Sequence, residues 1–350
     1  MIVGIPKERR PYEYRVGLPP AGVSLFLQHG HRVYVESGAG VGAGFRDQDY
    51  GREGAQIAYS GEELFGRADL ALKFARPLRE ELESLREGAA LAGFLHLAAA
   101  REDKLQLIAE KQLTALAYEL VQEDSGERPI MAPLSQIGGR MAVQIAARLL
   151  QNDHGGRGIL LGGLAGVPPA EVAVLGAGVA GSTAAAAFLE AGAHVTVLDS
   201  ELRRLQALQS GRGAGLLTLL ATPPNIRRVC AYADVLVGAV AVPGERAPVL
   251  VGREVVAQMK PRALILDLSI DQGGCIETSR PTDHGSPTFL EEGVLHYCVP
   301  NISGVLGRTA THALFMAAYP YLEQIASLGL AEALQASPAL ARAAARYSPA

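Results

Sequence analysis

Short apolar runs alternate with amphipathic segments along the first third of the chain. The apolar runs have the length of buried strands, and they read IVGIP, RVYVESG, LALKF, AALAGFL and TALAYEL. The segments between them, such as PPAGVSLFLQHG and REDKLQLIAEKQ, space their apolar residues as helices do. This alternation predicts a mostly parallel sheet covered by helices.

A second series of strands and helices follows a long helical pattern, GGRMAVQIAARLLQ. A glycine-rich segment, GGRGILLGGLAGVPP, comes next, and this shift in composition predicts a crossing between domains. The expected strands of the second series read EVAVLG, AHVTVLD, ADVLVGAV, ALILDLS and VLHYCVPN. Residues after about Gly304 are helical again. We expect this tail to return to the first domain, with SPALARAAARYSPA as an exposed terminal helix.

Three glycines, Gly176, Gly178 and Gly181, form a G-x-G-x-x-G pattern directly after the apolar run EVAVL. The first glycine permits a tight turn, the second lets the backbone approach a pyrophosphate, and the third lets helix and strand pack closely. The next expected strand ends in Asp199, whose carboxylate can accept hydrogen bonds from ribose hydroxyls. The pattern therefore predicts a dinucleotide-binding site.

The fingerprint favours NAD over NADP, because the carboxylate of Asp199 would repel a 2′-phosphate. Arg203 and Arg204 lie just beyond it and weaken this preference. The helix that starts at Val179 and Ala180 would face the phosphates with its N-terminus. A flavin site, or a glycine-rich turn that serves only packing, is the alternative interpretation.

These patterns predict an α/β fold with two Rossmann-like doubly wound parallel-sheet domains and a cleft between them. Residues 131–304 would form the NAD-binding Rossmann domain. Residues 1–130, joined by residues 305–350, would form the substrate domain, which carries the catalytic residues.

The composition disfavours several classes of function. The 350 residues include no Trp, and they carry a net charge of −4 with no long basic run, so we expect no nucleic-acid partner. No apolar run reaches the length of a membrane span, so we expect no membrane partner. Cys230, Cys275 and Cys298 share no metal-ligand or redox spacing, which predicts reduced thiols in a cytoplasmic protein and no bound metal.

Polar residues follow the expected strands at their carboxyl ends, where open parallel sheets bind ligands. In the first domain Arg15 and His96 follow strands, and Glu119 closes one; in the second, Asp271 and Asn301 follow strands. Each residue alone has a structural explanation, since a histidine after a strand is commonly a cap. Together they provide a cation, an imidazole and a carboxylate, which suit a small anionic substrate that meets a nicotinamide.

The chain as a whole resembles the alanine dehydrogenase family, which includes the NAD-binding subunit of proton-pumping transhydrogenase. The resemblance covers nearly the whole chain and is carried by GIPKE, YRVGLPPAGV, FLHLAA, AYELVQ, GGRMAVQ, GAGVAG, IDQGG and HYCVPN. It implies reversible, NAD-dependent oxidative deamination of L-alanine to pyruvate and ammonium. It also implies a homo-oligomer, typically a hexamer.

The resemblance also implies roles for individual residues. Arg15 would hold the substrate carboxylate, His96 would be the general acid/base, and Asp271 would help to activate the water that adds to the imine. Substrate would also contact Lys73 and Asn301. The cofactor would contact Ser135, Gly176, Gly178, Val179, Ala180, Gly181, Asp199, Arg204, Val240, Asp271 and Asn301.

One substrate-site charge of the family is missing. Where the family usually reads K-V-K-E-P, this chain reads KFARP, so Ala75 replaces a lysine that supports the oxygen of pyruvate and Arg76 replaces an acid. Lys73 shares a strand face with Ala75, about 6.6 Å back, whereas Arg76 points to the opposite face unless Pro77 turns the chain. We therefore expect this strand end not to deliver the family's usual charge. Further differences fall on the substrate side, at Leu134, Gln136, Ile302, Ser303 and Gly307.

Three functions stay open on the sequence. The first is an alanine dehydrogenase, slowed by the missing lysine. The second is a dehydrogenase of another small amino or keto acid, for which Ala75 would enlarge the pocket and Arg76 could meet an added acidic group. The third is a non-catalytic NAD(H)-binding protein or a relic of the transhydrogenase subunit. That subunit also lacks the second lysine, which favours this function. It normally lacks the histidine of HLAA, so the presence of His96 counts against it.

Overall fold

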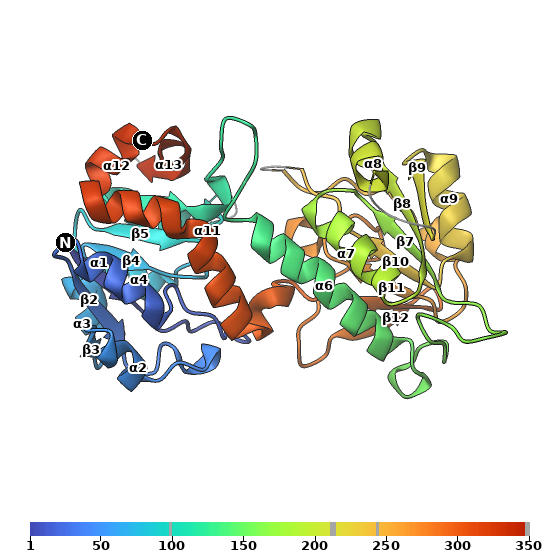
Figure 1. The fold of residues 1–350 in the computed structure, drawn as a ribbon, viewed down its shortest axis with the longest axis horizontal. Coiled ribbons are helices and arrows are strands. Elements are labelled where there is room, and N and C mark those ends of the chain that lie inside the picture. Colours follow the sequence, from blue (N-terminus) through green and yellow to red (C-terminus); the bar gives the residue numbers. More distant parts are fainter. Residues whose placement is uncertain (98–99, 211–214, 243–244, 347–350) are drawn as a thin grey trace. The chain divides into compact units, whose positions relative to one another are not determined.

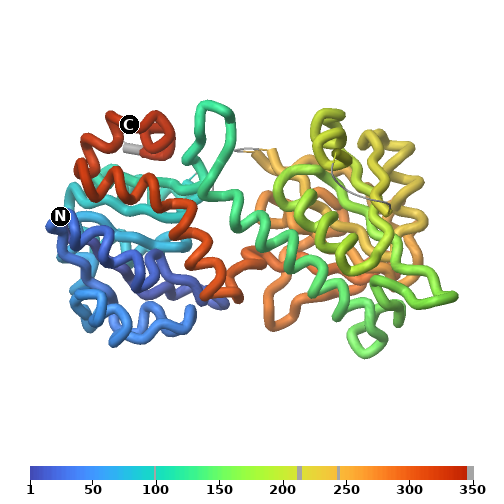
Figure 2. Tube along the Cα trace, viewed as in Figure 1, coloured from blue at the N-terminus to red at the C-terminus, as the bar shows by residue number. Residues whose placement is uncertain are grey.

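The structure, a computed structural model, describes residues 1–97, 100–210, 215–242 and 245–346 (Figure 1). The chain divides into two compact units. Unit 1 contains Met1–Leu134 and Ser303–Ala350, and unit 2 contains Ser135–Ile302. The C-terminal segment therefore belongs to the same unit as the N-terminal segment (Figure 2). Both units have the predicted doubly wound α/β fold.

Unit 1 is built on a seven-stranded sheet in the order β14-β6-β5-β4-β1-β2-β3. All of its strands are parallel except β14, which runs antiparallel to β6 at one edge. The strands β4, β5 and β6 are buried at every position, as expected for a parallel sheet covered on both faces. The bounds are β1 Ile2–Ile5, β2 Arg32–Glu36, β3 Gln56–Ala58, β4 Leu70–Leu72, β5 Ala90–Gly93, β6 Thr114–Ala117 and β14 Ala344–Arg346.

The winding of this sheet reverses between β1 and β4. From β1 the chain continues outward through β2 and β3, and from β4 it continues through β5 and β6 on the other side. Doubly wound sheets bind ligands at such a switch point, outside the carboxyl ends of the strands. The helices of the unit are α1 Val23–Leu27, α2 Asp47–Arg52, α3 Gly61–Arg67, α4 Arg79–Ser84, α5 Glu102–Glu110, α11 Gly307–Leu328, α12 Leu330–Ala336 and α13 Pro338–Ala343.

Unit 2 has a second seven-stranded sheet in the order β12-β13-β11-β10-β7-β8-β9, in which only β12 is antiparallel to its neighbour. Its winding reverses between β7 and β10. The strands are β7 Glu171–Leu175, β8 His194–Asp199, β9 Leu216–Leu220, β10 Val235–Gly238, β11 Leu264–Asp267, β12 Thr288–Glu291 and β13 Val294–Tyr297. The helices are α6 Ala132–Leu149, whose first three residues belong to unit 1, α7 Val179–Glu190, α8 Leu202–Gln209, α9 Pro223–Tyr232 and α10 Arg253–Val256.

Helices α6 and α7 pack closely because α6 carries a glycine at the contact. A Cβ at Gly139 would lie 2.5 Å from the carbonyl oxygen of Ala180 on α7. Such a contact is too short for any other residue, so the second glycine of the motif GGRMAVQ serves this helix packing. It thereby helps to hold the helix whose N-terminus carries the dinucleotide fingerprint.

Two expectations about chain organisation were wrong. The glycine-rich segment at 155–169 lies within unit 2, so its composition marks a loop and not a crossing between units. The last described residues do not form an exposed helix, because α13 buries Ala339 and Leu340 and β14 then adds a strand to the sheet. Residues 347–350 lie outside the described residues. The strands β3, β9 and β12, all at or beside sheet edges, were not predicted.

Candidate active site

Four neighbouring strands of unit 1 end at one edge of the sheet, and each is followed by a charged or titratable residue. Arg10 and Arg15 follow β1, Arg76 follows β4, His96 follows β5, and Glu119 follows β6. Because these strands are parallel and adjacent, the loops after them gather at the same edge, beside the switch point. The structure thus brings together residues that lie more than 100 positions apart in the sequence.

His96 is held in a left-handed backbone conformation by Glu119. Its φ is 46°, which is uncommon for a residue other than glycine. The buried Glu119 carboxylate accepts the backbone N–H of Leu95 at 3.1 Å and that of His96 at 2.5 Å. These hydrogen bonds offset the backbone strain, so Glu119 positions the imidazole. The sequence placed Glu119 at a strand end but gave no sign of this role.

The surroundings of His96 favour a neutral imidazole. The side chain is exposed on unit 1, yet partial desolvation lowers its pKa to about 4, helped by the positive charges of Arg76, Arg10 and Arg15 in that order. At pH 7 the imidazole is therefore unprotonated and can accept a proton. A bound anion would offset the three cations and raise this pKa.

Arg15 is engaged by its own chain. Its Nε and Nη2 atoms each lie 2.5 Å from an oxygen of the Glu13 carboxylate, and Nη1 donates to Ser303 Oγ at 2.9 Å. Its guanidinium carbon lies 3.9 Å from the ring centroid of Phe74, and the residue is only 5% exposed. The charge of Arg15 is therefore largely balanced by Glu13. A contact with substrate stays a prediction.

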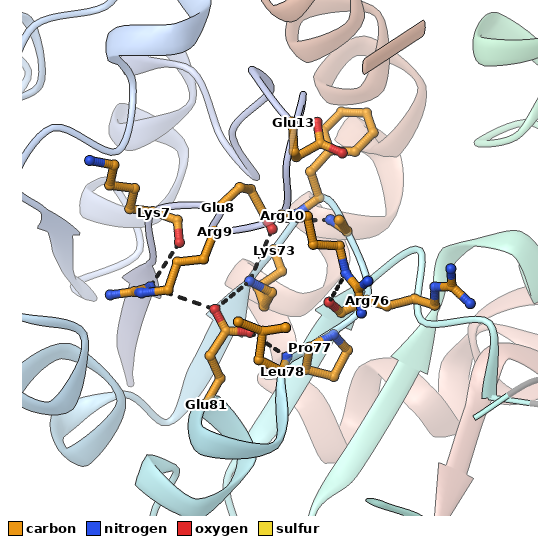
Figure 3. A network of polar contacts seen from close by, with 12 residues as sticks. Lys7, Glu8, Arg9, Arg10, Glu13, Lys73, Arg76, Pro77, Leu78 and Glu81 are labelled. Carbon is orange, nitrogen blue, oxygen red and sulfur yellow. Dashed lines mark hydrogen bonds and ion pairs between the residues drawn. The ribbon is translucent and has the colours of Figure 1, made fainter. Parts of the chain in front are cut away.

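Lys73 lies in a buried ion network and does not face open space (Figure 3). Its ammonium donates to Glu8 and to Glu81, each at 3.0 Å, and the side chain is 1% exposed. Burial lowers the pKa of Lys73, but attraction to the two carboxylates outweighs it, so the net pKa is raised and the charge is retained. The Lys73 ammonium is therefore occupied by two carboxylates, and its contact with substrate stays a prediction.

Glu8 links this network to the end of β4. Its Oε1 accepts the backbone N–H of Phe74 at 2.7 Å and that of Ala75 at 3.2 Å, while its Oε2 accepts from Lys73. Burial raises the pKa of Glu8, and the lysine and the backbone hydrogen bonds act against this. The carboxylate thus fixes the turn from which Arg76 projects. No sequence motif predicted that Glu8 would hold the turn after β4.

In unit 2, the three fingerprint glycines are required for different reasons. Gly176 has a φ of 98°, and a Cβ there would lie 2.4 Å from the carbonyl oxygen of Ala239. A Cβ at Gly181 would lie 1.8 Å from the carbonyl oxygen of Gly176. Gly178, in contrast, has ordinary backbone angles and nothing within 4 Å of a Cβ. Its space is open at the N-terminus of α7, which fits the approach of a pyrophosphate.

Asp199 lies at the end of β8 and holds the glycine turn. Its Oδ2 accepts the backbone N–H of Ala177 at 2.6 Å, and its Oδ1 accepts that of Glu201 at 2.8 Å. Each oxygen retains a lone pair that can accept from a ribose hydroxyl. Arg204 lies 3.9 Å from Asp199 but makes a shorter ion pair, 2.8 Å, with Glu201.

The remaining predicted residues of unit 2 lie at or near its switch-point edge. The backbone N–H of Val240, in the loop after β10, donates to Ser269 Oγ at 2.9 Å. The backbone N–H of Asn301 lies 3.1 and 3.2 Å from the two oxygens of Asp271, so the structure brings these two residues together. Ser135 lies, partly buried, in the first turn of α6.

The sequence analysis did not identify Asp267, although this residue shapes the loop that follows β11. It is the last residue of the buried strand β11, and its carboxylate accepts the backbone N–H groups of Ser269 at 3.0 Å and Cys275 at 3.1 Å. Burial raises its pKa, while these hydrogen bonds lower it. The signal was an acid at the end of a fully apolar strand, which needs backbone donors to remain buried.

Comparisons with known proteins identify the family of this chain. Residues 4–138 match the family described as alanine dehydrogenase/PNT, N-terminal domain, and residues 142–348 match its C-terminal domain. The chain belongs to the alanine dehydrogenase/PNT family. An alanine dehydrogenase of Methanococcus maripaludis is 43% identical over 341 residues, which are 97% of this chain and 91% of that protein. An alanine dehydrogenase of Bacillus subtilis is also 43% identical over 341 residues, covering 97% and 89% of the two chains.

Solved structures of the family have the same fold. An L-alanine dehydrogenase superposes with a TM-score of 0.94 at 42% identity, covering 99% of this chain and 96% of that one. A transhydrogenase from Sinorhizobium meliloti superposes with a TM-score of 0.81 at 28% identity, covering 94% and 95%. Within the described part of this family member, no helix combines the length and apolar character needed to cross a membrane.

We expect replacement of Lys73 to destabilise this family member. Lys73→Met leaves Glu8 and Glu81 buried without their shared cation, which should lower the free energy of unfolding by about 3–5 kcal/mol. Urea unfolding at pH 7 measures the change, and Lys7→Met at an exposed position serves as the control, with an expected change within about 0.5 kcal/mol. Unchanged stability combined with a raised KM for substrate would show instead that Lys73 binds substrate.

The open space at Gly178 gives a second prediction. Gly178→Ala should weaken NADH binding about tenfold or more, because the methyl group fills space needed by the pyrophosphate. The free energy of unfolding should change by no more than about 1 kcal/mol. NADH fluorescence titration and urea unfolding measure the two effects. Gly181→Ala, which clashes within the protein, should lose stability; unchanged NADH binding by Gly178→Ala would contradict the assignment.

Proposed function

We propose that this protein is an NAD-dependent alanine dehydrogenase, which converts L-alanine to pyruvate and ammonium reversibly. The observation that carries the proposal is the neutral, exposed imidazole of His96 beside three arginines at the switch-point edge of unit 1. Relatives about 42% identical over nearly the whole chain bear the same name. Another amino or keto acid as substrate, or a purely binding role, is not favoured.

Unit 1 is assigned the binding of substrate and unit 2 that of NAD. Substrate carboxylate is an anion, and the arginines beside His96 provide a positive field that attracts it. For the cofactor, Gly176, Gly178 and Gly181 would cradle the pyrophosphate, while Asp199 would accept from the adenosine ribose. When bound, NAD supplies the acceptor for the hydride that leaves the alanine Cα. Val179, Ala180, Ser135, Arg204 and Val240 are assigned to the same cofactor site.

The proton transfers are assigned to His96 and Asp271. Neutral His96 accepts a proton during oxidation of the amine and returns it in the reverse reaction. Asp271, held against the backbone of Asn301, would accept a proton from the water that adds to the imine. Collapse of the carbinolamine releases ammonium and leaves pyruvate. Glu119 holds His96 in place throughout.

A cytoplasmic location and a homohexamer are also proposed. Cys230, Cys275 and Cys298 are free and buried, which suits a reducing compartment. The hexamer rests on the family resemblance, and light scattering of the purified protein tests it.

The test of this function is turnover in both directions. The protein should reduce NAD with L-alanine and oxidise NADH with pyruvate and ammonium, and pyruvate should have the highest kcat/KM in a panel of 2-oxo acids. His96→Gln should lower kcat by about 10²- to 10⁴-fold without loss of NADH binding, because the general acid/base is removed.

His29→Gln, at an exposed position of the same unit, should leave kcat unchanged and serves as the control. If the protein binds NADH tightly but turns over no 2-oxo acid, the proposal is wrong and the protein has a non-catalytic role. If kcat/KM for another 2-oxo acid is tenfold higher than that for pyruvate, the assigned substrate is wrong.

A further inference from the structure

Arg10 and Arg76 act on His96, and among the described residues neither forms a close ion pair. Arg10 donates through Nε to the carbonyl oxygen of Arg76 at 3.1 Å, which brings the two residues together (Figure 3). Across the residues that the structure describes, neither guanidinium has a carboxylate oxygen within 4.0 Å, whereas Arg15 is paired with Glu13. Arg10 is attracted by Glu81, Glu8 and Glu13 from farther away. Arg76 is exposed and Arg10 is half-buried. Like charges held close together without a counterion are costly unless an anion joins them.

Arg76 and His96 follow two neighbouring strands at the same edge of the sheet. In the sheet, Leu70 pairs with Ala90 and Leu72 with Ala92. The pairing continues past the strand ends, since Phe94 N–H donates to the carbonyl oxygen of Phe74 at 3.0 Å and their rings lie 5.6 Å apart. Arg76 and His96 each lie two residues beyond this contact, on the loops that follow β4 and β5, and the charge of Arg76 acts on His96.

The direction of Arg76 is set by the turn that Glu8 fixes. Glu8 binds the N–H groups of Phe74 and Ala75, and the Arg76 side chain extends away from the Glu8–Lys73–Glu81 network (Figure 3). After burial, the charge of Arg76 has the largest lowering effect on the pKa of His96. The charge of Arg76 also acts on Arg10. The pKa of Arg10 is lowered mainly by burial and secondly by repulsion from Arg76.

We propose that Arg76, held by Arg10, binds the anionic end of the substrate beside His96 and supplies the cation that Ala75 does not. The proposal rests on the proposed function, since it names the residue that binds alanine or pyruvate. It differs from the sequence-based expectation, in which this strand end delivers no charge. Arg76 thereby takes the place of the missing lysine one position later in the chain.

The first experiment compares Arg76→Gln with wild type in turnover. We expect kcat/KM for pyruvate to fall about 10- to 100-fold, because a charge-assisted contact is lost. Arg76→Lys, which keeps the charge, should recover part of the loss. Arg52→Gln, an exposed arginine of the same unit, removes the same charge elsewhere and should change kcat/KM by less than about twofold.

The second experiment follows His96 itself and needs no turnover. In protein with ¹³C-labelled histidine, the His96 signal is identified by its loss in His96→Gln. Arg76→Gln should raise the pKa of His96 in the free enzyme, because a facing cation is removed while Arg10 and Arg15 remain. Oxalate, an anion that resembles pyruvate, should raise the wild-type pKa of His96, and Arg76→Gln should bind it about tenfold more weakly.

The two experiments separate this inference from the proposed function. If wild type is inactive on alanine and pyruvate but oxalate binding depends on Arg76, the function is wrong and the anion site stands. If wild type is active while Arg76→Gln keeps its kcat/KM and its oxalate affinity, the function stands and the inference is overturned. Wild type that binds no oxalate, with or without NADH, also overturns the inference.

Discussion

The carboxylate of Glu8 is the contact on which the substrate-side architecture depends. It is buried, and it accepts from Lys73 with one oxygen and from two successive backbone N–H groups with the other. A buried carboxylate needs such partners to stay charged, and Lys73 in turn needs both Glu8 and Glu81. This network fixes the end of β4 at the point where the sheet reverses its winding. Arg76 projects from that end, and its carbonyl oxygen accepts from Arg10.

Charge balance decides which cations are available at this edge. Arg15 was predicted to bind the substrate carboxylate, and two of its nitrogens donate to the Glu13 carboxylate while its guanidinium stacks on Phe74. Lys73 likewise forms ion pairs with Glu8 and Glu81. Arg10 and Arg76 are left to act on His96, together with the attenuated charge of Arg15. A neutral imidazole within a positive field suits both the attraction of a carboxylate and the transfer of a proton.

Much of the fold could be predicted from the sequence, and the site only in part. The periodicity of buried strands and the glycine fingerprint predicted both sheets, because those patterns follow directly from burial and from close backbone contacts. The role of Lys73 could not be predicted, since its partners Glu8 and Glu81 come from other segments of the chain. Arg76 was expected to point to the opposite face from Ala75 unless Pro77 turned the chain, an expectation that assumes a regular strand. The strand ends at Leu72, and Glu8 governs the turn that follows.

The most direct test of this account moves the cation back by one residue. The double variant Ala75→Lys, Arg76→Gln carries the positive charge at position 75 in place of position 76. If the site requires a cation that projects from the end of β4, the double variant recovers most of the kcat/KM for pyruvate that Arg76→Gln alone loses. A double variant that stays as slow as Arg76→Gln, while folded and able to bind NADH, would contradict the account.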